Sequence, residues 1–107
     1  MEEISVSELK AALDAGDAVL IDVRELDEWN AGHIAQAIHN PMSSFDLAAI
    51  PTTGEILFIC RSGNRSGQVG NYVEQHDVSA VNIVGGMKAW ASAGFEMESA
   101  TGIPEVI

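Results

Sequence analysis

The chain has 107 residues, 47% of them hydrophobic, and its 16 acidic and 5 basic residues give a formal net charge of −11. This length predicts a single domain over residues 1–107 with one hydrophobic core, and the apolar content excludes a disordered chain. The negative charge disfavours nucleic acid and anionic membrane surfaces as partners. A single cysteine excludes an internal disulfide and a cysteine-rich metal site.

The acidic start of the sequence, Met1-Glu2-Glu3, lacks the apolar stretch of a signal peptide. No segment approaches the roughly 20 apolar residues that cross a bilayer. These two features predict a cytoplasmic location. His39 and His76 have no partner at metal-ligand spacing, so we expect neither a metal nor a cofactor.

Helix and strand patterns alternate along the chain. In chain order the predicted elements are a helix over 7–15, a strand over 18–23, a short helix over 25–30, a strand over 37–39, a helix ending at 49, a turn over 51–54, a strand over 56–60, a helix over 64–76, a strand over 81–84 and a helix over 87–93. Ser7 is the expected cap of the first helix and Gly16 its end. Ser43 or Ser44 is expected to cap the helix that ends at 49. The segment 96–107 shows no pattern and is either an ordered cover or a loose end.

This alternation defines the expected fold class. The strand over 18–23 is apolar on both faces, which is typical of a buried strand in a parallel sheet. Strands that alternate with helices form a parallel sheet with helices on both faces and right-handed crossovers. We therefore predict an α/β fold.

The segment from Cys60 to Ser66 carries the clearest chemical signal, because it directly follows the apolar run 56–59. A strand that leads through a Gly-containing loop into a helix forms an anion cradle, since backbone N–H groups and the positive end of the helix converge there. Ligands of parallel sheets bind beyond the carboxyl ends of the strands, where Cys60 is expected to lie. A thiolate is stabilised in such a place. Cys60 is therefore predicted to be a nucleophile rather than an inert packing residue.

The loop after Cys60 is the predicted anion-binding segment, and its members are Arg61, Ser62, Gly63, Asn64, Arg65 and Ser66. Its backbone N–H groups would stabilise negative charge on sulfur, and Gly63 would let the loop curl. Arg61 and Arg65 are candidates to bind an anionic substrate. Arg65 is favoured because it opens the helix, whereas pairing with surface acids is the alternative for Arg61. Ser66 is expected either to donate a hydrogen bond to the sulfur or to cap the helix.

Four segments, in this order and spacing, resemble the rhodanese domain. They are Asp22-Val23-Arg24-Glu25, Gly32-His33-Ile34 with the following 37–41, the loop 60–66, and Gly85-Gly86-Met87-Lys88-Ala89-Trp90. The resemblance extends over residues 4–95 and is to the single-domain members. It implies a five-stranded parallel sheet flanked by helices on both faces. It also implies a sulfurtransferase that carries sulfur as a persulfide on Cys60.

The resemblance further implies the reactants. The donor would be thiosulfate or a related compound such as polysulfide, and the acceptor cyanide, a thiol or a protein that accepts sulfur. Asp22 and Arg24 would be scaffold beside the loop, with Arg24 paired to Asp22, Glu25 or Glu28. A Cys/His dyad with His33 is disfavoured, because Gly-His-Ile in rhodaneses resembles a structural turn.

Two other classes of protein remain as alternatives. Cysteine-based phosphatases and arsenate reductases also hold an oxyanion over a thiolate, but typically with a Cys-x5-Arg loop, whereas Cys60 and Arg65 form a shorter Cys-x4-Arg loop. An arsenate reductase that needs a second cysteine is excluded by composition. A non-catalytic regulatory module of the same fold would typically have lost the nucleophile. Sulfur transfer is therefore the leading hypothesis.

Overall fold

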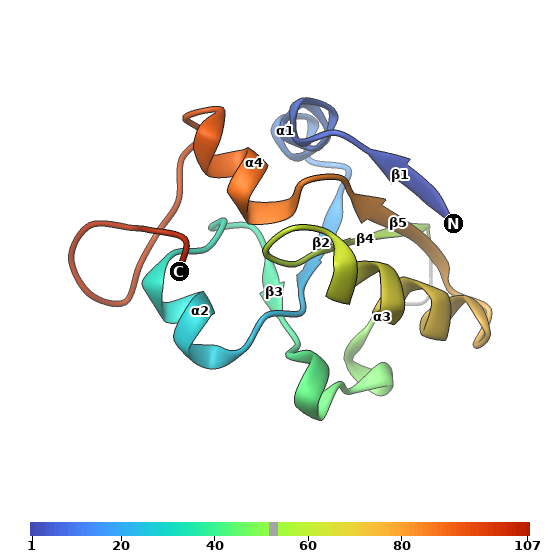
Figure 1. Cartoon of the computed structure of the whole chain (residues 1–107). Helices are drawn as coiled ribbons and strands as arrows, with labels where there is room; N and C mark the ends of the chain where they lie inside the picture. The colour runs from blue at the N-terminus through green and yellow to red at the C-terminus, as the bar shows by residue number, and fades with distance from the viewer. Residues whose placement is uncertain (52–53) are drawn as a thin grey trace.

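The computed structural model describes residues 1–51 and 54–107, so part of the turn predicted over 51–54 lies outside the described residues. Over these residues the chain forms a five-stranded sheet with the strand order β1-β5-β4-β2-β3 (Figure 1). The strands are β1 (Glu2–Ile4), β2 (Val19–Asp22), β3 (Ile38–His39), β4 (Glu55–Ile59) and β5 (Ser79–Ile83). Every neighbouring pair is parallel, which confirms the predicted α/β fold.

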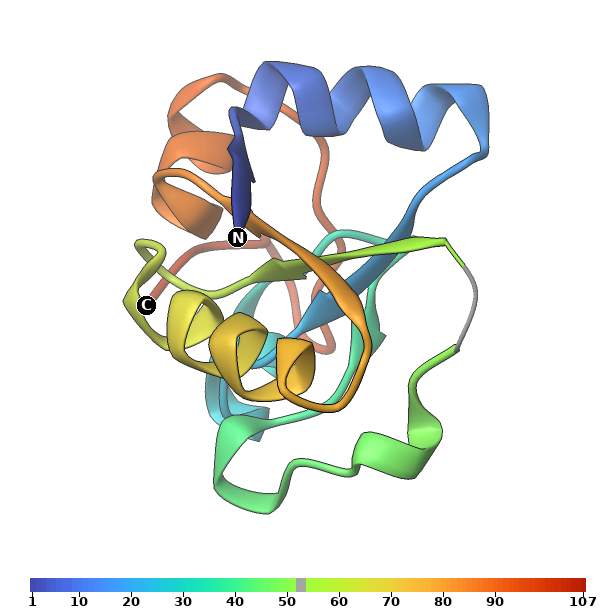
Figure 2. The ribbon, with the colours of Figure 1, turned by 90° about the vertical axis from the view of Figure 1, so that its right-hand side faces the viewer.

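Helices cover both faces of this sheet, as expected. The α-helices are α1 (Val6–Ala15), α2 (Leu26–Ala31), α3 (Asn64–Glu74) and α4 (Gly86–Ser92). Figure 2 shows α1 and α4 on one side of the sheet and α3 on the other. None of the helices in the described part of the chain is long and apolar enough to span a bilayer.

The core consists of two apolar layers, one on each face of the sheet. Along β4 the side chains alternate between them: Leu57 and Ile59 pack with α1 and α4, whereas Ile56 and Phe58 pack with α3. This is the two-residue period of a strand, and burial of both faces explains why the strand sequences are continuously apolar. Cys60 continues the alternation on the α3 side.

The predicted cap of the first helix was wrong by two residues. The Ser5 hydroxyl accepts a hydrogen bond from the Glu8 backbone N–H at 3.1 Å, and the Glu8 carboxylate accepts one from the Ser5 N–H at 3.1 Å. This reciprocal pair requires a serine three residues before a glutamate, whereas Ser7 is followed at that spacing by Lys10. The predicted end at Gly16 is confirmed by its left-handed backbone, with φ of 80°.

The helix predicted to end at 49 is also wrong, because the segment forms two 3-10 turns, η1 (Met42–Ser44) and η2 (Leu47–Ala49). The buried Asn40 side chain donates to the Asp46 carbonyl at 3.0 Å and accepts from the Asp46 N–H at 2.9 Å. These two bonds hold Asp46 in extended backbone, and its carboxylate then caps η2 through the Ala48 N–H. A helix cannot pass through this residue.

The C-terminal segment is an ordered cover, the first of its two predicted alternatives. It lies beside α2 in Figure 1, where the Ala100 N–H donates to the Asn30 carbonyl and the Glu105 N–H to the Ala31 carbonyl, both at 2.9 Å. Met97 and Val106 pack against the apolar layer of α1 and α4. The segment therefore closes one side of the core.

Gly86 provides a test of how tightly α4 packs against the Cys60 loop. Its φ is 55°, and a Cβ at this position would overlap the carbonyl oxygens of Cys60 and Arg61. We expect Gly86→Ala to lower the free energy of unfolding by about 3 kcal/mol, measured by urea denaturation. Gly94→Ala is the matched control, because its φ is 77° but nothing lies within 4 Å of the added Cβ. The Gly94→Ala substitution should lower the free energy of unfolding by about 1 kcal/mol. Equal losses of stability in the two variants would show that the Cys60 loop moves away from the added Cβ without an energetic cost.

Candidate active site

Cys60 lies immediately beyond β4, the middle strand of the sheet, and its side chain is only 1% exposed. The loop that follows leads directly into α3, which begins at Asn64. The sulfur therefore lies at the carboxyl edge of a parallel sheet and beside the positive end of an 11-residue helix.

Hydrogen bonds to the Cys60 sulfur come from the backbone of the loop and from a side chain on α3. The backbone N–H of Gly63 lies 3.1 Å from Sγ, and the hydroxyl oxygen of Ser66 lies 3.2 Å from it. Gly63 has a φ of 109°, which turns the loop back toward the cysteine and which a residue with a side chain rarely adopts. Gly63 also occupies the cap position of α3, so the alternative that Ser66 caps the helix is wrong.

These contacts shift the ionisation of the thiol. Burial raises the pKa of Cys60, but hydrogen bonds from the Ser66 hydroxyl and from the backbone N–H groups of Ser66, Gly63 and Ser62 lower it, and the net pKa lies below the ordinary value. The fraction of thiolate near neutral pH is therefore larger than in an unstructured peptide. The loop has the electrostatics that a cysteine nucleophile requires.

Asn82 on β5 is a member of this site that the sequence reasoning missed. Its amide oxygen accepts a hydrogen bond from the Ser66 hydroxyl at 2.6 Å, and its amide nitrogen donates to the Gly63 carbonyl at 3.0 Å. The same nitrogen donates to the Glu3 carboxylate on β1 at 3.3 Å. The sequence did contain a signal for this residue: the amide of Asn82 stands between the apolar residues Val81 and Ile83, and a buried amide needs hydrogen-bond partners.

Asp22 and Arg24 form a fully buried ion pair, with Nη2 of the arginine 2.7 Å from Oδ2 of the aspartate. Of the three acids considered as partners of Arg24, the structure selects Asp22. Arg24 also donates to the carbonyl of Gly32 at 2.8 Å. The pair thus joins the end of β2 to the end of α2, and it makes no hydrogen bond with Cys60 in the described part of the chain.

Arg65 is paired with an acid on a different helix. Its two terminal nitrogens lie 2.7 and 2.8 Å from the carboxylate oxygens of Glu28 on α2. The hydrogen bonds with Arg65 hold the pKa of Glu28 below its usual range, and the same bonds raise the pKa of Arg65. Much of the charge of Arg65 is therefore balanced by Glu28.

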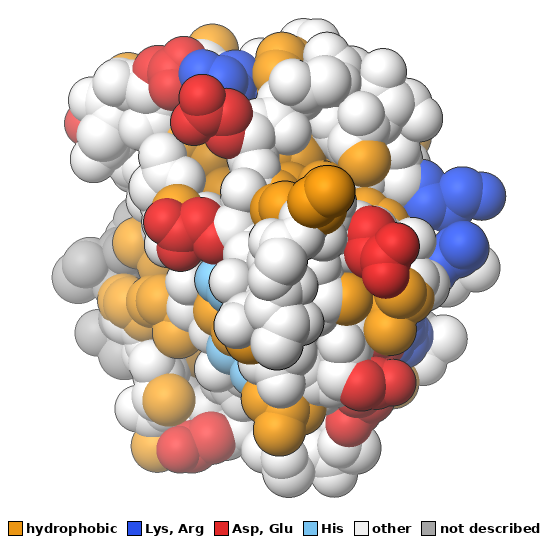
Figure 3. All heavy atoms as spheres, turned by 90° about the vertical axis from the view of Figure 1, so that its left-hand side faces the viewer, with side chains coloured by type: hydrophobic (Ala, Val, Ile, Leu, Met, Phe, Trp, Pro, Cys, Tyr) orange, Lys and Arg blue, Asp and Glu red, His pale blue; other side chains and the backbone are white. Residues whose placement is uncertain are grey.

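Arg61 is exposed, and its Nε donates to the carbonyl of Ile107 at 3.0 Å. Its terminal guanidinium nitrogens make no hydrogen bond within residues 1–51 and 54–107. Lys88 is exposed as well, and its backbone N–H donates to the Arg61 carbonyl at 3.0 Å. On the face that Figure 3 shows, basic side chains lie along one edge and also at the top, where they adjoin acidic ones, and acidic side chains are scattered over the face. Arg61 and Lys88 thus supply two exposed cations next to the Cys60 loop.

His33 and His39 belong to an aromatic stack rather than to a catalytic dyad. Trp29 stacks on His33 with ring centroids 3.8 Å apart and on His39 at 4.7 Å. His33 Nδ1 lies 2.8 Å from the carbonyl oxygen of Trp29, and His39 Nε2 lies 2.7 Å from that of Arg24. Neither ring makes a hydrogen bond with Cys60 in the described residues. The same residues contain no group of three or more His, Cys, Asp or Glu side chains that could hold a metal ion.

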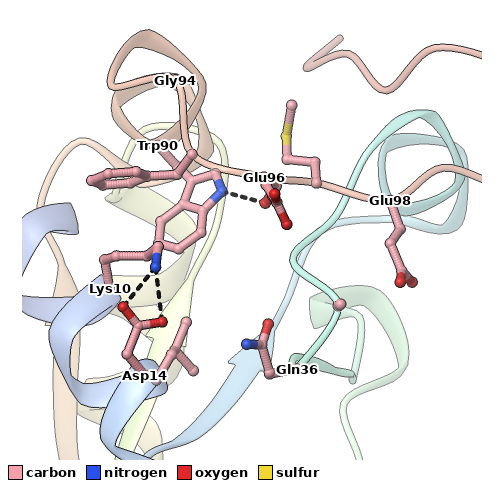
Figure 4. A pocket seen from close by; sticks show the side chains of 11 residues that line it. Lys10, Asp14, Gln36, Trp90, Gly94, Glu96 and Glu98 are labelled. Carbon is pink, nitrogen blue, oxygen red and sulfur yellow. Dashed lines mark hydrogen bonds and ion pairs between the residues drawn. The ribbon is translucent and has the colours of Figure 1, made fainter.

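Two surface pockets lie apart from the loop. The first, of about 380 Å³, opens between α1, the end of α4 and the C-terminal segment, where Lys10 pairs with Asp14 and Trp90 donates to the Glu96 carbonyl (Figure 4). The second, of about 430 Å³, is apolar and includes Tyr72 on α3. Neither is lined by any residue from 60 to 66.

The fold and the site together define an α/β protein with a buried cysteine at the start of a strand–loop–helix segment that donates hydrogen bonds to its sulfur. The chain belongs to the rhodanese-like family, because the model of the Rhodanese-like domain matches residues 5–93. YtwF of Bacillus subtilis is 40% identical over 93 residues, which cover 84% of this chain and 90% of that protein. A protein of Allochromatium vinosum named Sulfurtransferase is 33% identical over 106 residues, which cover 95% of this chain and 99% of that protein.

Solved structures agree with this assignment. SSP1007 of Staphylococcus saprophyticus is 40% identical, with a TM-score of 0.81 over 90% of this chain and 99% of that chain. A rhodanese-like domain protein of Staphylococcus aureus is 33% identical, with a TM-score of 0.82 over 92% of this chain and 100% of that chain. The resemblance found in the four sequence segments is thereby confirmed for the family and the fold.

The hydroxyl of Ser66 provides a test of how the thiolate is stabilised. Because Ser66→Ala removes a hydrogen bond that lowers the pKa of Cys60, we expect that pKa to rise and the rate of alkylation by iodoacetamide at pH 7 to fall about fivefold. The rate should recover as the pH is raised through the new pKa. Ser62→Ala is the control, since Ser62 acts through its backbone N–H, and it should leave the rate unchanged. Equal rates in both variants would remove the role of the Ser66 hydroxyl.

Proposed function

We propose that this protein is a sulfurtransferase that carries sulfur as a persulfide on Cys60. The observation that carries the proposal is the pair of hydrogen bonds from Gly63 and Ser66 to the Cys60 sulfur, in a loop between the central strand and a helix. These donors lower the pKa of the thiol, which favours a thiolate nucleophile. Membership of the rhodanese-like family and the name of the Allochromatium vinosum relative support the same activity.

The reaction with thiosulfate needs no proton transfer. The Cys60 thiolate attacks the outer sulfur of thiosulfate, a bond between the two sulfurs forms, and the bond from the outer sulfur to the sulfonate group breaks. Sulfite leaves with the electron pair, and the persulfide anion remains. Cyanide or a thiolate then takes the terminal sulfur, and the Cys60 thiolate is restored. Polysulfide is a second donor of the same class, and a protein thiol is a second acceptor.

The loop has groups for both negative charges in this reaction. Backbone N–H groups between Arg61 and Ser66 would stabilise the persulfide anion. The exposed guanidinium of Arg61 would bind the sulfonate end of the donor, because its terminal nitrogens make no hydrogen bond in the described part of the chain. Arg65, the arginine favoured from the sequence, would contribute less to binding than Arg61, since Glu28 already pairs with its guanidinium.

Intact mass spectrometry after exposure to thiosulfate, without reductant, tests the proposed function. We expect the wild-type protein to gain the mass of one sulfur atom, the Cys60→Ser variant to gain none, and cyanide to remove the sulfur as thiocyanate. Cys60→Ser is nearly isosteric, so the fold should survive. An adduct on Cys60→Ser, or no adduct on the wild type with either thiosulfate or polysulfide, would contradict the proposal and direct attention to phosphatase assays.

The different environments of the two arginines lead to a kinetic prediction. We expect Arg61→Ala to raise KM for thiosulfate about tenfold with kcat changed less than about twofold, and Arg65→Ala to raise KM less. The assay is thiocyanate formation in the presence of cyanide. Lys10→Ala is the matched control, because it removes a cation that pairs with Asp14 away from the loop. An Arg61→Ala variant that behaves like Lys10→Ala would eliminate the assigned role.

A further inference from the structure

We propose that Asn82 is a positioning residue for Cys60, because its amide oxygen competes with the cysteine sulfur for the single proton of the Ser66 hydroxyl. The inference deepens the proposed function by adding a residue that touches neither the sulfur nor a substrate. Asn82 is 5% exposed and lies on β5, beside β4, the strand that directly precedes Cys60.

The orientation of the Asn82 amide is fixed by its surroundings. Its Nδ2 faces the carbonyl oxygen of Gly63 at 3.0 Å and the carboxylate of Glu3 at 3.3 Å. A carbonyl oxygen can accept a hydrogen bond but cannot donate one, and the same holds for the ionised carboxylate of Glu3. A rotated amide would place Oδ1 against these two acceptors. The amide oxygen must therefore face Ser66, where it lies 2.6 Å from the hydroxyl oxygen.

The Ser66 hydroxyl has one proton and two acceptors within reach. Asn82 Oδ1 lies at 2.6 Å and Cys60 Sγ at 3.2 Å. When Cys60 is a thiolate, the charge on Sγ attracts the proton, and Oδ1, which is buried, then loses the one donor that the described residues give it. When Sγ is a neutral thiol or the inner sulfur of a persulfide, the hydroxyl returns to Oδ1, and the thiol can itself donate to the serine oxygen.

This competition sets how strongly the thiolate is stabilised. The unsatisfied amide oxygen costs free energy only in the thiolate state, so Asn82 keeps Ser66 from stabilising the thiolate fully. A less stabilised thiolate is a stronger nucleophile, because nucleophilicity falls as the pKa of the thiol falls. Asn82 therefore balances the amount of thiolate against its reactivity, and it does so through Ser66.

Removal of the Asn82 amide leaves the hydrogen bond from the Gly63 N–H to the Cys60 sulfur in place. The Gly63 carbonyl also accepts a hydrogen bond from the Gly67 N–H at 3.1 Å, within the first turn of α3. The Gly63 N–H itself donates to Sγ and not to Asn82, and the Gly63 carbonyl keeps its bond from Gly67 when Asn82 is replaced by a smaller residue. The effect of such a replacement on Cys60 is then the effect on Ser66 alone.

Charged groups surround Cys60 on every element that packs near it. They are Glu3 on β1, Asp22 and Arg24 after β2, Glu25 and Glu28 at α2, Arg61 in the loop, Arg65 on α3 and Lys88 on α4. An uncharged replacement of Asn82 leaves all of them in place. A change in the pH dependence of Cys60 in that variant therefore results from the Ser66 hydroxyl and not from a changed electrostatic field at the sulfur.

Titration of the single cysteine tests the inference without any sulfur donor. The measurement is the ultraviolet absorbance of the thiolate together with the rate of alkylation by iodoacetamide as a function of pH. We expect the alkylation rate at pH 7 to rise about threefold in Asn82→Ala, because Ser66 then donates to the thiolate without competition. We expect it to fall about tenfold in Asn82→Asp, because a carboxylate retains the serine proton more strongly than an amide.

The same substitutions in a Ser66→Ala background complete the test. The effect of Asn82→Ala should disappear there, and that of Asn82→Asp should shrink to the contribution of the added charge. A lower rate in both single variants, or equal shifts with and without Ser66, would overturn the inference, since loosening of the loop predicts both. If Asn82→Asp does not fold, Asn82→Ala decides alone, because an unchanged or lower rate contradicts the competition. Failure of the persulfide experiment would leave this titration unaffected, so the two proposals fail separately.

Discussion

Two backbone hydrogen bonds from α4 hold the loop on which the site depends. The Met87 N–H donates to the Cys60 carbonyl at 2.8 Å, and the Lys88 N–H donates to the Arg61 carbonyl at 3.0 Å. In a trans peptide the C=O and N–H point in opposite directions, so carbonyls turned toward α4 aim the next N–H groups away from it. The Ser62 N–H, which follows the Arg61 carbonyl, accordingly lowers the pKa of the Cys60 thiol. The close approach of α4 that this requires leaves no room for a side chain at Gly86.

The few basic residues of the chain fall into two groups, those that form ion pairs within the fold and those that stay exposed near the Cys60 loop. Arg24 forms a buried ion pair with Asp22, and Arg65 joins α3 to α2 through its ion pair with Glu28. Arg61 and Lys88 remain exposed beside the loop. In a chain of net charge −11, two of the five basic residues thus stay exposed in the loop after the buried sulfur or on the helix that is bonded to it.

The sequence predicted the parts of the molecule that local patterns determine. Apolar runs located β2 and β4, and the Gly-containing loop located the Cys60 cradle between β4 and α3. It missed β1, because Glu2-Glu3-Ile4 is short and polar and becomes a strand only by pairing with β5. The pairing of Ser66 with Asn82 was not predictable for the same reason, since the partners meet through the order of the strands and not through spacing along the chain. The fold class and the position of Cys60 are thus determined by local patterns, whereas the hydrogen-bond network around Cys60 is not.

The strand order also has a consequence for how the molecule behaves in a crowded solution. The outermost strands, β1 and β3, have three and two residues, and β1 begins with Glu2 and Glu3. Edge strands this short offer a neighbouring molecule few unpaired backbone groups on which to add a strand, and the charges of β1 disfavour such pairing further. The aggregation-prone apolar strands β2, β4 and β5 are enclosed between them. The sheet is thereby protected from growing into fibrils by the same two strands that contribute least to its core.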